Sequence, residues 1–239
     1  MALPTRSLPV LPPASAASER LLPAHPVLAA VLPQAALQRG TVVHCSGTAA
    51  ESLALLVAST ASYEGAWTAV AGGDTLGLRA AVELGISLER LVIVRDAPTG
   101  FSEQQWGEIL AVMIDGFDLV LVGRRAVDRI RPAIARRLQA RAQSRGAITV
   151  LIGNQGTFIA DIEVRAAVGE WSGLGQGHGC ARAREVQIEI TGRRVPRPQQ
   201  VTAWLPSDLG DCELSVVLPA PSAIVQPVGE RSTAMRQAG

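Results

Sequence analysis

Five short apolar runs alternate with helical patterns over the first two thirds of this sequence, and this alternation constrains the fold most. Strands are predicted at Val42–Val43, Trp67–Ala71, Leu91–Val94, Asp118–Val122 and Ala147–Ile152. Helices are predicted at Ala49–Tyr63, Leu76–Leu84, Ser102–Ile114 and Ile130–Ser144. Strands that are joined through helices pair in parallel. The sequence therefore predicts an α/β fold with a mainly parallel sheet flanked by helices.

The composition agrees with this fold class and limits the kinds of partner. Apolar residues make up 48% of the 239 residues but aromatic residues only 3%, so Ala, Val and Leu dominate, as in helix-covered parallel sheets. The formal net charge is +1, so a basic binding site must be local. All 22 basic residues are arginines.

The pattern changes after Gly153. Three segments alternate apolar and polar residues, as antiparallel strands with one solvated face do: Ile159–Ala166, Val186–Thr191 and Val201–Leu205. A glycine-rich turn, Gly169–Gly179, separates the first two. We expect these strands to extend the parallel sheet at one edge.

Three regions are predicted along the chain. Residues 1–38 form a proline-rich arm, which we expect to pack on its own domain rather than on a neighbour. Residues 39–206 form the core domain, and residues 207–239 a flexible tail in which Leu214–Leu218 is able to dock as a short strand.

Cysteine usage and hydropathy point to the cytoplasm. The three cysteines are odd in number and widely spaced, which fits neither a disulfide framework nor a paired metal site. No apolar run reaches the roughly 18 residues of a membrane span. Prolines interrupt the N-terminal segment where a signal peptide needs a continuous apolar stretch.

The stretch Thr41–Leu56 reads as strand, small-residue loop and helix, where a nucleotide-binding α/β protein carries its phosphate loop. Such a loop needs glycines, a lysine for the phosphates and a hydroxyl for Mg²⁺. Ala50 and Glu51 stand where the lysine and hydroxyl belong, and the chain contains no lysine. We therefore predict a degenerate loop without cofactor, made of Ser46, Gly47, Thr48, Ala49, Ala50 and Glu51.

From about Leu37 to Leu205 the order of parts resembles the ATPase core of bacterial RecA. Gln38–Val43 is similar to the strand before the phosphate loop, and Leu84–Leu91 to the segment before the third strand. Asp118–Val122 resembles the Walker B strand, and Asn154-Gln155 the Asn-Gln before the second DNA-binding loop. The resemblance implies a RecA-like sheet.

Departures from RecA imply that catalysis is lost. By the resemblance, the catalytic glutamate would fall at Gly73, with Asp74 beside it, and the Walker B strand ends in Gly123 instead of an aspartate. Both DNA-binding loops are short or missing. No catalytic residue and no metal site is therefore predicted.

A lysine-free RecA-like core with the run Trp171–Gly179 also resembles actinobacterial ImuA-type proteins. The resemblance implies a non-catalytic accessory role in a translesion synthesis complex of the DNA-damage (SOS) response, the mutasome. Its implied partners are an ImuB-type Y-family-like protein and an error-prone C-family DNA polymerase, with RecA as a further candidate. Such a protein is nucleoid-associated when it is in the complex.

Arginines crowd the segment from Arg124 to Arg145, which contains a single acid, Asp128. At helical spacing, four of them cannot all pair with acids close in sequence: Arg129, Arg136, Arg137 and Arg141. They form either a basic face for DNA phosphate or an acidic partner, or a solvated outer helix surface. Aromatic residues that would stack on bases are missing here, which counts against single-strand binding.

Other candidates rest on single residues. Trp171, in the glycine-rich turn, is a candidate partner contact or a local packing residue. His44 and Cys45 are adjacent on a strand, so they point to opposite faces and do not form a nucleophilic pair. Asp74, Asp96 and Asp118, near strand ends, are interpreted as cap and turn residues.

Three rival functions remain open at this point. As alternatives to the accessory role, the chain would be a SulA-like inhibitor of cell division, a DNA-binding RecA paralogue acting through the arginine helix, or an active nucleotide-dependent recombinase paralogue. The missing lysine argues most directly against the last of these.

Overall fold

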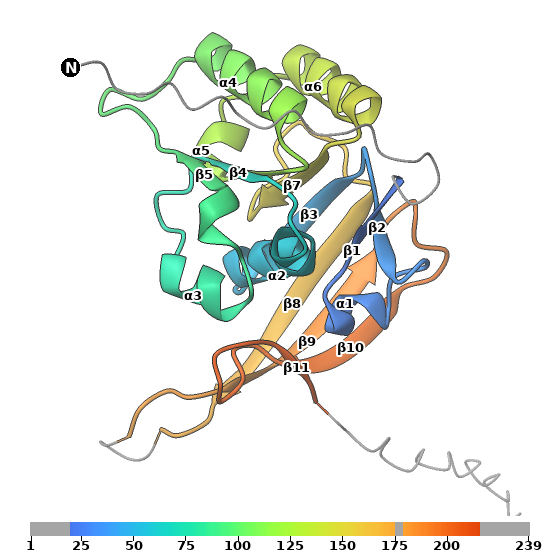
Figure 1. Ribbon diagram of the computed structural model, residues 1–239, viewed down its shortest axis with the longest axis vertical. Helices are drawn as coiled ribbons and strands as arrows, with labels where there is room; N and C mark the ends of the chain where they lie inside the picture. The colour runs from blue at the N-terminus through green and yellow to red at the C-terminus, as the bar shows by residue number, and fades with distance from the viewer. Residues whose placement is uncertain (1–19, 175–178, 216–239) are drawn as a thin grey trace, which may run out of the picture.

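The protein is described by a computed structural model that covers residues 20–174 and 179–215. Its centre is a nine-stranded mixed sheet with the strand order β11-β10-β9-β8-β3-β7-β6-β4-β5 (Figure 1). The five predicted strands are confirmed as neighbouring parallel strands: β3 (Val42–Gly47), β4 (Thr68–Ala71), β5 (Leu91–Val94), β6 (Leu119–Val122) and β7 (Ile148–Ile152).

Helices cover both faces of the sheet and create two separate cores. Alternate residues of one strand enter different cores: Leu119 and Leu121 of β6 pack with α2 (Ala50–Tyr63), whereas Val120 and Val122 pack with the other helices. Those other helices are α4 (Glu103–Gly116), α5 (Arg124–Val127) and α6 (Pro132–Arg145), and α3 (Leu78–Glu83) lies on the α2 side. The short 3₁₀ helix η2 (Leu88–Arg90) precedes β5.

Local sequence signals set the ends of these helices. Ser102 is the N-cap of α4, where its hydroxyl accepts from the backbone N–H of Gln105 at 3.3 Å. Gly146 ends α6 in the left-handed conformation, with φ +74°. The predicted start of that helix was too early, because Pro132 occupies its first turn and residues 124–127 form the separate helix α5.

The second part of the sheet is mixed rather than purely antiparallel. Strand β8 (Ile162–Trp171) pairs in parallel with β3, and only then do β9 (Arg184–Thr191), β10 (Gln199–Trp204) and β11 (Glu213–Leu214) continue antiparallel. The chain between β7 and β8 returns to the start of β3, where the N–H of Asp161 donates to the carbonyl of Val42 at 2.8 Å. This return makes β8 run in the direction of β3.

The glycine-rich segment also differs from the prediction. Gly169 lies inside β8 rather than in a turn, and a bulge falls between Val168 and Trp171. Beyond it, Leu174 and Gly179 form an isolated bridge that brackets residues 175–178, which lie outside the described residues.

Both predicted terminal regions contribute to the core where the structure describes them. Strands β1 (Leu21–Pro23) and β2 (Ala36–Gln38) pair with each other around helix α1 (Pro26–Ala29), and their apolar side chains join the α2-side core. This part of the arm therefore packs on its own domain, as expected. At the other end Ser207 and Cys212 are buried, so the fold extends to Ser215, past the boundary predicted at residue 206.

In the described part of the chain, no helix has the length and apolar character needed to cross a lipid bilayer.

Candidate functional site

A cleft of about 480 Å³ opens at the carboxyl ends of β3, β4, β6 and β7. Doubly wound α/β proteins bind ligands at this edge of the sheet. The cleft is lined by Gly47–Ser52, Gly72–Leu76, Gly123–Arg125 and Ile152–Gly153. It therefore includes five of the six residues that the sequence assigned to a degenerate phosphate loop.

The loop between β3 and α2 is too short to surround a phosphate group. Strand β3 continues to Gly47, which pairs with Ala166 of β8, and α2 begins at Ala50. Only Thr48 and Ala49 connect them, whereas a phosphate loop places four residues between its first glycine and its Gly-Lys pair. Gly47 has φ +89°, and a Cβ there would collide with the carbonyl oxygen of Ala166. This glycine serves strand pairing.

Two further glycines line the cleft at positions where the resemblance to RecA led us to expect acidic residues. A Cβ at Gly123 would collide with the backbone of Gly72, and a Cβ at Gly73 would collide with the side chain of Val70. Val70 is fully buried, so it has little freedom to move away. Packing at the ends of β4 and β6 thus leaves no room for a side chain at either glycine.

Charged side chains in the cleft are engaged with one another. Arg125 pairs with Asp74 at 3.2 Å, and Arg124 pairs with Asp128 at 3.5 Å. Glu51 accepts a hydrogen bond from the hydroxyl of Thr75, which joins the start of α2 to the β4–α3 loop. A phosphate here would face the Glu51 carboxylate and would have to compete with carboxylates for both arginines.

His44 and Cys45 do not interact as a catalytic pair. The Nε2 atom of His44 lies 3.2 Å from the carbonyl oxygen of Gly153, while Cys45 is fully buried. Burial raises the pKa of the Cys45 thiol, which therefore stays protonated at neutral pH. Within residues 20–174 and 179–215, no three His, Cys, Asp or Glu side chains gather in a way that would hold a metal ion.

Two of the three aspartates near strand ends stabilise local structure. Asp118 precedes β6 at its amino end, accepts from the N–H of Trp67 at 3.0 Å and pairs with Arg39 at 2.8 Å. Asp96 accepts from the N–H of Phe101 at 2.7 Å. Only Asp74 lies in the cleft.

The arginine-rich segment is partly neutralised by acids from another helix. Arg141 donates to Asp115 of α4 at 2.7 Å, and Arg145 donates to the same carboxylate at 3.1 Å. The hydrogen bond from Arg141 holds the pKa of Asp115 below its ordinary value. Arg131 pairs with Glu103 at 2.9 Å. The sequence-based prediction considered only acids close in the chain, whereas Asp115 lies 26 residues from Arg141 and 30 residues from Arg145.

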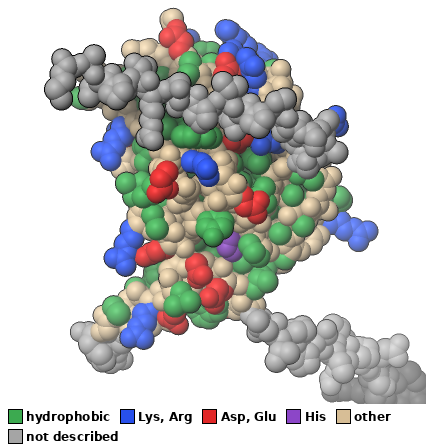
Figure 2. All heavy atoms as spheres, in the orientation of Figure 1, with side chains coloured by type: hydrophobic (Ala, Val, Ile, Leu, Met, Phe, Trp, Pro, Cys, Tyr) green, Lys and Arg blue, Asp and Glu red, His purple; other side chains and the backbone are tan. Residues whose placement is uncertain are grey.

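Three of the four candidate arginines nevertheless have no ion pair within the described residues: Arg129, Arg136 and Arg137. All three are exposed. Figure 2 shows basic and acidic side chains side by side at the end of the molecule formed by α4 and α6. This surface therefore carries a local excess of positive charge, not a continuous basic face.

Trp171 lies in a different part of the molecule. It is 38% exposed at the end of β8, and the guanidinium of Arg184 lies 4.8 Å from its ring centroid. The β8–β9 hairpin extends at the opposite end of the molecule from α4 and α6 (Figure 1). The structure therefore does not bring Trp171 and the candidate arginines together.

Sequence reasoning missed a groove between α4 and α6. It has a volume of about 440 Å³ and is lined by Gln104, Gly107, Glu108, Ala111, Ile134, Arg137, Leu138 and Arg141. A signal for it exists in the sequence, because Gly107 is unusual inside a helix and here lets Ile134 approach closely.

Comparisons with known proteins place the chain in a family. Residues 30–156 match the family described as MT3502 N-terminal domain, and this region contains all five central parallel strands. Over 178 residues the chain is 34% identical to the uncharacterized protein Rv3395c of Mycobacterium tuberculosis strain H37Rv. This alignment covers 74% of the chain and 72% of Rv3395c. The chain belongs to the MT3502 N-terminal domain family.

Proposed function

We propose that this chain is a non-catalytic, RecA-like accessory protein of a DNA-damage-induced translesion synthesis complex. Its partners in this proposal are an ImuB-type Y-family-like protein and, through the complex, an error-prone C-family DNA polymerase. Its contribution is a folded surface that holds partners together, without nucleotide hydrolysis.

The observation that carries the proposal is the backbone of the cleft. Gly47, Gly73 and Gly123 occupy places where the resemblance to RecA expects phosphate-binding and acidic residues, and each is confined by neighbouring atoms. In this proposal, the loss of nucleotide binding therefore involves the main chain as well as the side chains. Because a fold does not by itself imply a function, a cleft whose loops pack for strand pairing supports a scaffold role better than a catalytic one.

The order of the strands supports the RecA-like part of the proposal. Five parallel strands are followed by β8, parallel to β3, and then by the antiparallel strands β9 and β10. A mainly parallel sheet with antiparallel strands at one edge is compatible with a RecA-like core, although β8 is parallel where the alternation of its residues predicted an antiparallel strand.

The proposal is tested by affinity purification of the tagged protein from its native host after DNA damage, with co-eluting proteins identified by mass spectrometry. Untreated cells and an unrelated tagged protein serve as controls. We expect a Y-family-like protein and a C-family polymerase subunit to be enriched after damage, and the interaction with the first to be reproduced with purified proteins.

Other outcomes would replace the proposal. Enrichment of cell-division proteins, with filamentous growth on overproduction, would favour the SulA-like function. Recovery of DNA without either polymerase-related protein would favour a DNA-binding paralogue.

A further inference from the structure

We infer that the groove between α4 and α6 is the docking site for an amphipathic helix of a protein partner, with acidic residues along the flank that faces α6. This inference rests on the proposed function and adds to it the surface and the chemistry of the contact.

The groove has the form of a helix-binding site. Its lining residues recur on α4 as Gln104, Gly107, Glu108 and Ala111, and on α6 as Ile134, Arg137, Leu138 and Arg141. Both sets follow the i, i+3, i+4, i+7 spacing of a single helix face. Each set spans about 10 Å of helix, which is the length of two turns of a bound helix.

The floor of the groove is apolar and firmly packed. Leu138 is buried and Ile134 and Ala111 are half-buried, and Ile134 approaches Gly107 across the floor. A partner that lays an apolar stripe here removes these side chains from water, which is the usual source of affinity in such grooves.

Charge on the two rims selects the orientation of the partner. On the α6 rim, Arg137 is exposed and has no ion pair with any described residue, whereas Arg141 is bound to Asp115. On the α4 rim stands Glu108, which accepts a hydrogen bond from the neutral amide of Gln104 at 2.9 Å. A carboxylate on the partner pairs best with Arg137, and the opposite flank of the same helix must avoid acids near Glu108.

The same rims argue against a nucleic acid in this groove. A phosphate backbone carries one sign of charge along its whole length, so Glu108 would repel it where Arg137 attracts it. The groove also contains no aromatic side chain on which a base could stack.

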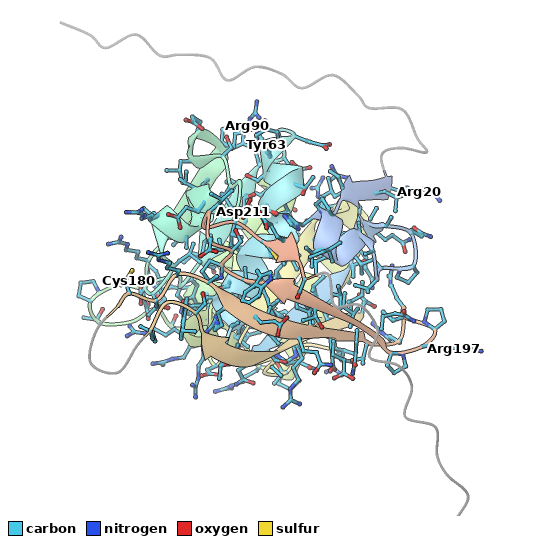
Figure 3. The ribbon with its side chains drawn as sticks, turned by 90° about the horizontal axis from the view of Figure 1, so that it is seen from below. Arg20, Tyr63, Arg90, Cys180, Arg197 and Asp211 are labelled. Atoms are coloured by element: carbon cyan, nitrogen blue, oxygen red, sulfur yellow. The ribbon has the colours of Figure 1, made fainter. Side chains whose placement is uncertain are left out.

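The test uses the full-length chain and the purified Y-family-like protein recovered in the affinity purification. Arg137→Glu reverses the charge of the α6 rim, and Ala111→Trp fills the groove. Their matched controls are Arg197→Glu, at an exposed arginine that does not line the groove, and Val112→Trp, at the neighbouring α4 residue that is 70% exposed (Figure 3 labels Arg197). Circular dichroism and thermal melting establish that each variant is folded.

We expect Arg137→Glu and Ala111→Trp each to raise the dissociation constant at least about tenfold. Both controls should bind like the wild type. Equal binding by all five proteins would overturn the groove as the contact but leave the proposed function standing. Failure of the wild type to bind would overturn both. If Arg137→Glu reduces binding to a 30-base-pair DNA duplex but not to the protein, the groove belongs to a nucleic-acid site and the inference is wrong.

Discussion

The two ends of the central parallel strands are built in opposite ways. At the amino ends, carboxylates connect neighbouring strands: Asp161 accepts from the N–H of Val42 at 2.9 Å and pairs with Arg193 at 2.8 Å, and Asp118 pairs with Arg39. At the carboxyl ends, glycines allow backbones to meet closely, and the cleft acids pair with local arginine or hydroxyl groups.

This difference separates stability from function in the molecule. In an α/β enzyme the carboxyl ends hold the reactive charges, because the loops there leave room for a ligand. Within the part of the chain that the structure describes, the most deeply buried carboxylate is that of Asp161, and it stands at the amino ends, where it bonds the N–H of Val42 and pairs with Arg193. Substitutions at the amino ends should therefore change stability, and a lysine and a hydroxyl introduced at the carboxyl ends should not create nucleotide binding.

The largest effect is expected for Asp161→Ala. The substitution leaves the N–H of Val42 without its buried acceptor and removes the common partner of Arg193 and Arg194. We expect a loss of about 3 kcal/mol in the free energy of unfolding, measured by urea denaturation. Asp208→Ala, at an exposed position, is the control and should change stability by less than about 0.5 kcal/mol. A loss of that small size for Asp161→Ala would contradict a structural role for this carboxylate.

A second pair of substitutions should separate the two reasons why a position requires glycine, a positive φ and a close approach of neighbouring atoms. Gly47→Ala combines an unfavourable φ of +89° with a collision against Ala166, and we expect it to cost about 3 kcal/mol. Gly85→Ala has a similar φ of +93° but nothing within 4 Å of its Cβ, so it should cost about 1 kcal/mol. Equal losses in urea denaturation would mean that close packing of β3 against β8 does not require Gly47.

Cys212 provides a pH test of the segment that follows β10. Burial, with Asp211 and Glu213 nearby, raises the pKa of its thiol from about 9 to about 12. Because the unfolded chain ionises first, this contribution to stability is complete below pH 9 and is lost as the pH rises toward 12. At pH 10 we expect a loss of about 1 kcal/mol from this group.

The measurement compares the free energy of unfolding at pH 7 and pH 10 for the wild type and Cys212→Ala. Burial of Cys45 lowers stability at high pH in both proteins, so the difference between them isolates Cys212. Identical pH dependence in the two proteins would show that the Cys212 thiol is hydrated in solution, contrary to its burial here.

How much of this molecule the sequence predicts depends on how far apart the interacting residues are in the chain. The five central strands follow from local patterns, and they were predicted correctly. The pairing of Arg141 with Asp115 and the collision that fixes Gly47 depend on residues brought together only by the fold. No local pattern contains them, so the sequence identifies the residues of the β3–α2 loop but not the contacts that fix their geometry.

The smallest expected effect is the sharpest test of the carboxyl ends. The double substitution Ala50→Lys and Glu51→Ser restores the lysine and hydroxyl of a phosphate loop and removes the carboxylate that a phosphate would face. If side chains alone were missing, this variant should bind Mg-ATP. We expect no binding by calorimetry for either the wild type or the variant, because Thr48 and Ala49 alone cannot supply the backbone N–H groups that surround a phosphate.

A protein with an intact phosphate loop, titrated under the same conditions, is the positive control. Saturable binding by the double variant would mean that the β3–α2 loop rearranges around the nucleotide and that Gly47 leaves its pairing with Ala166. The carboxyl ends would then retain a usable nucleotide site that only two side chains block. A flat titration, in contrast, would assign the loss to the backbone, which two substitutions do not reverse.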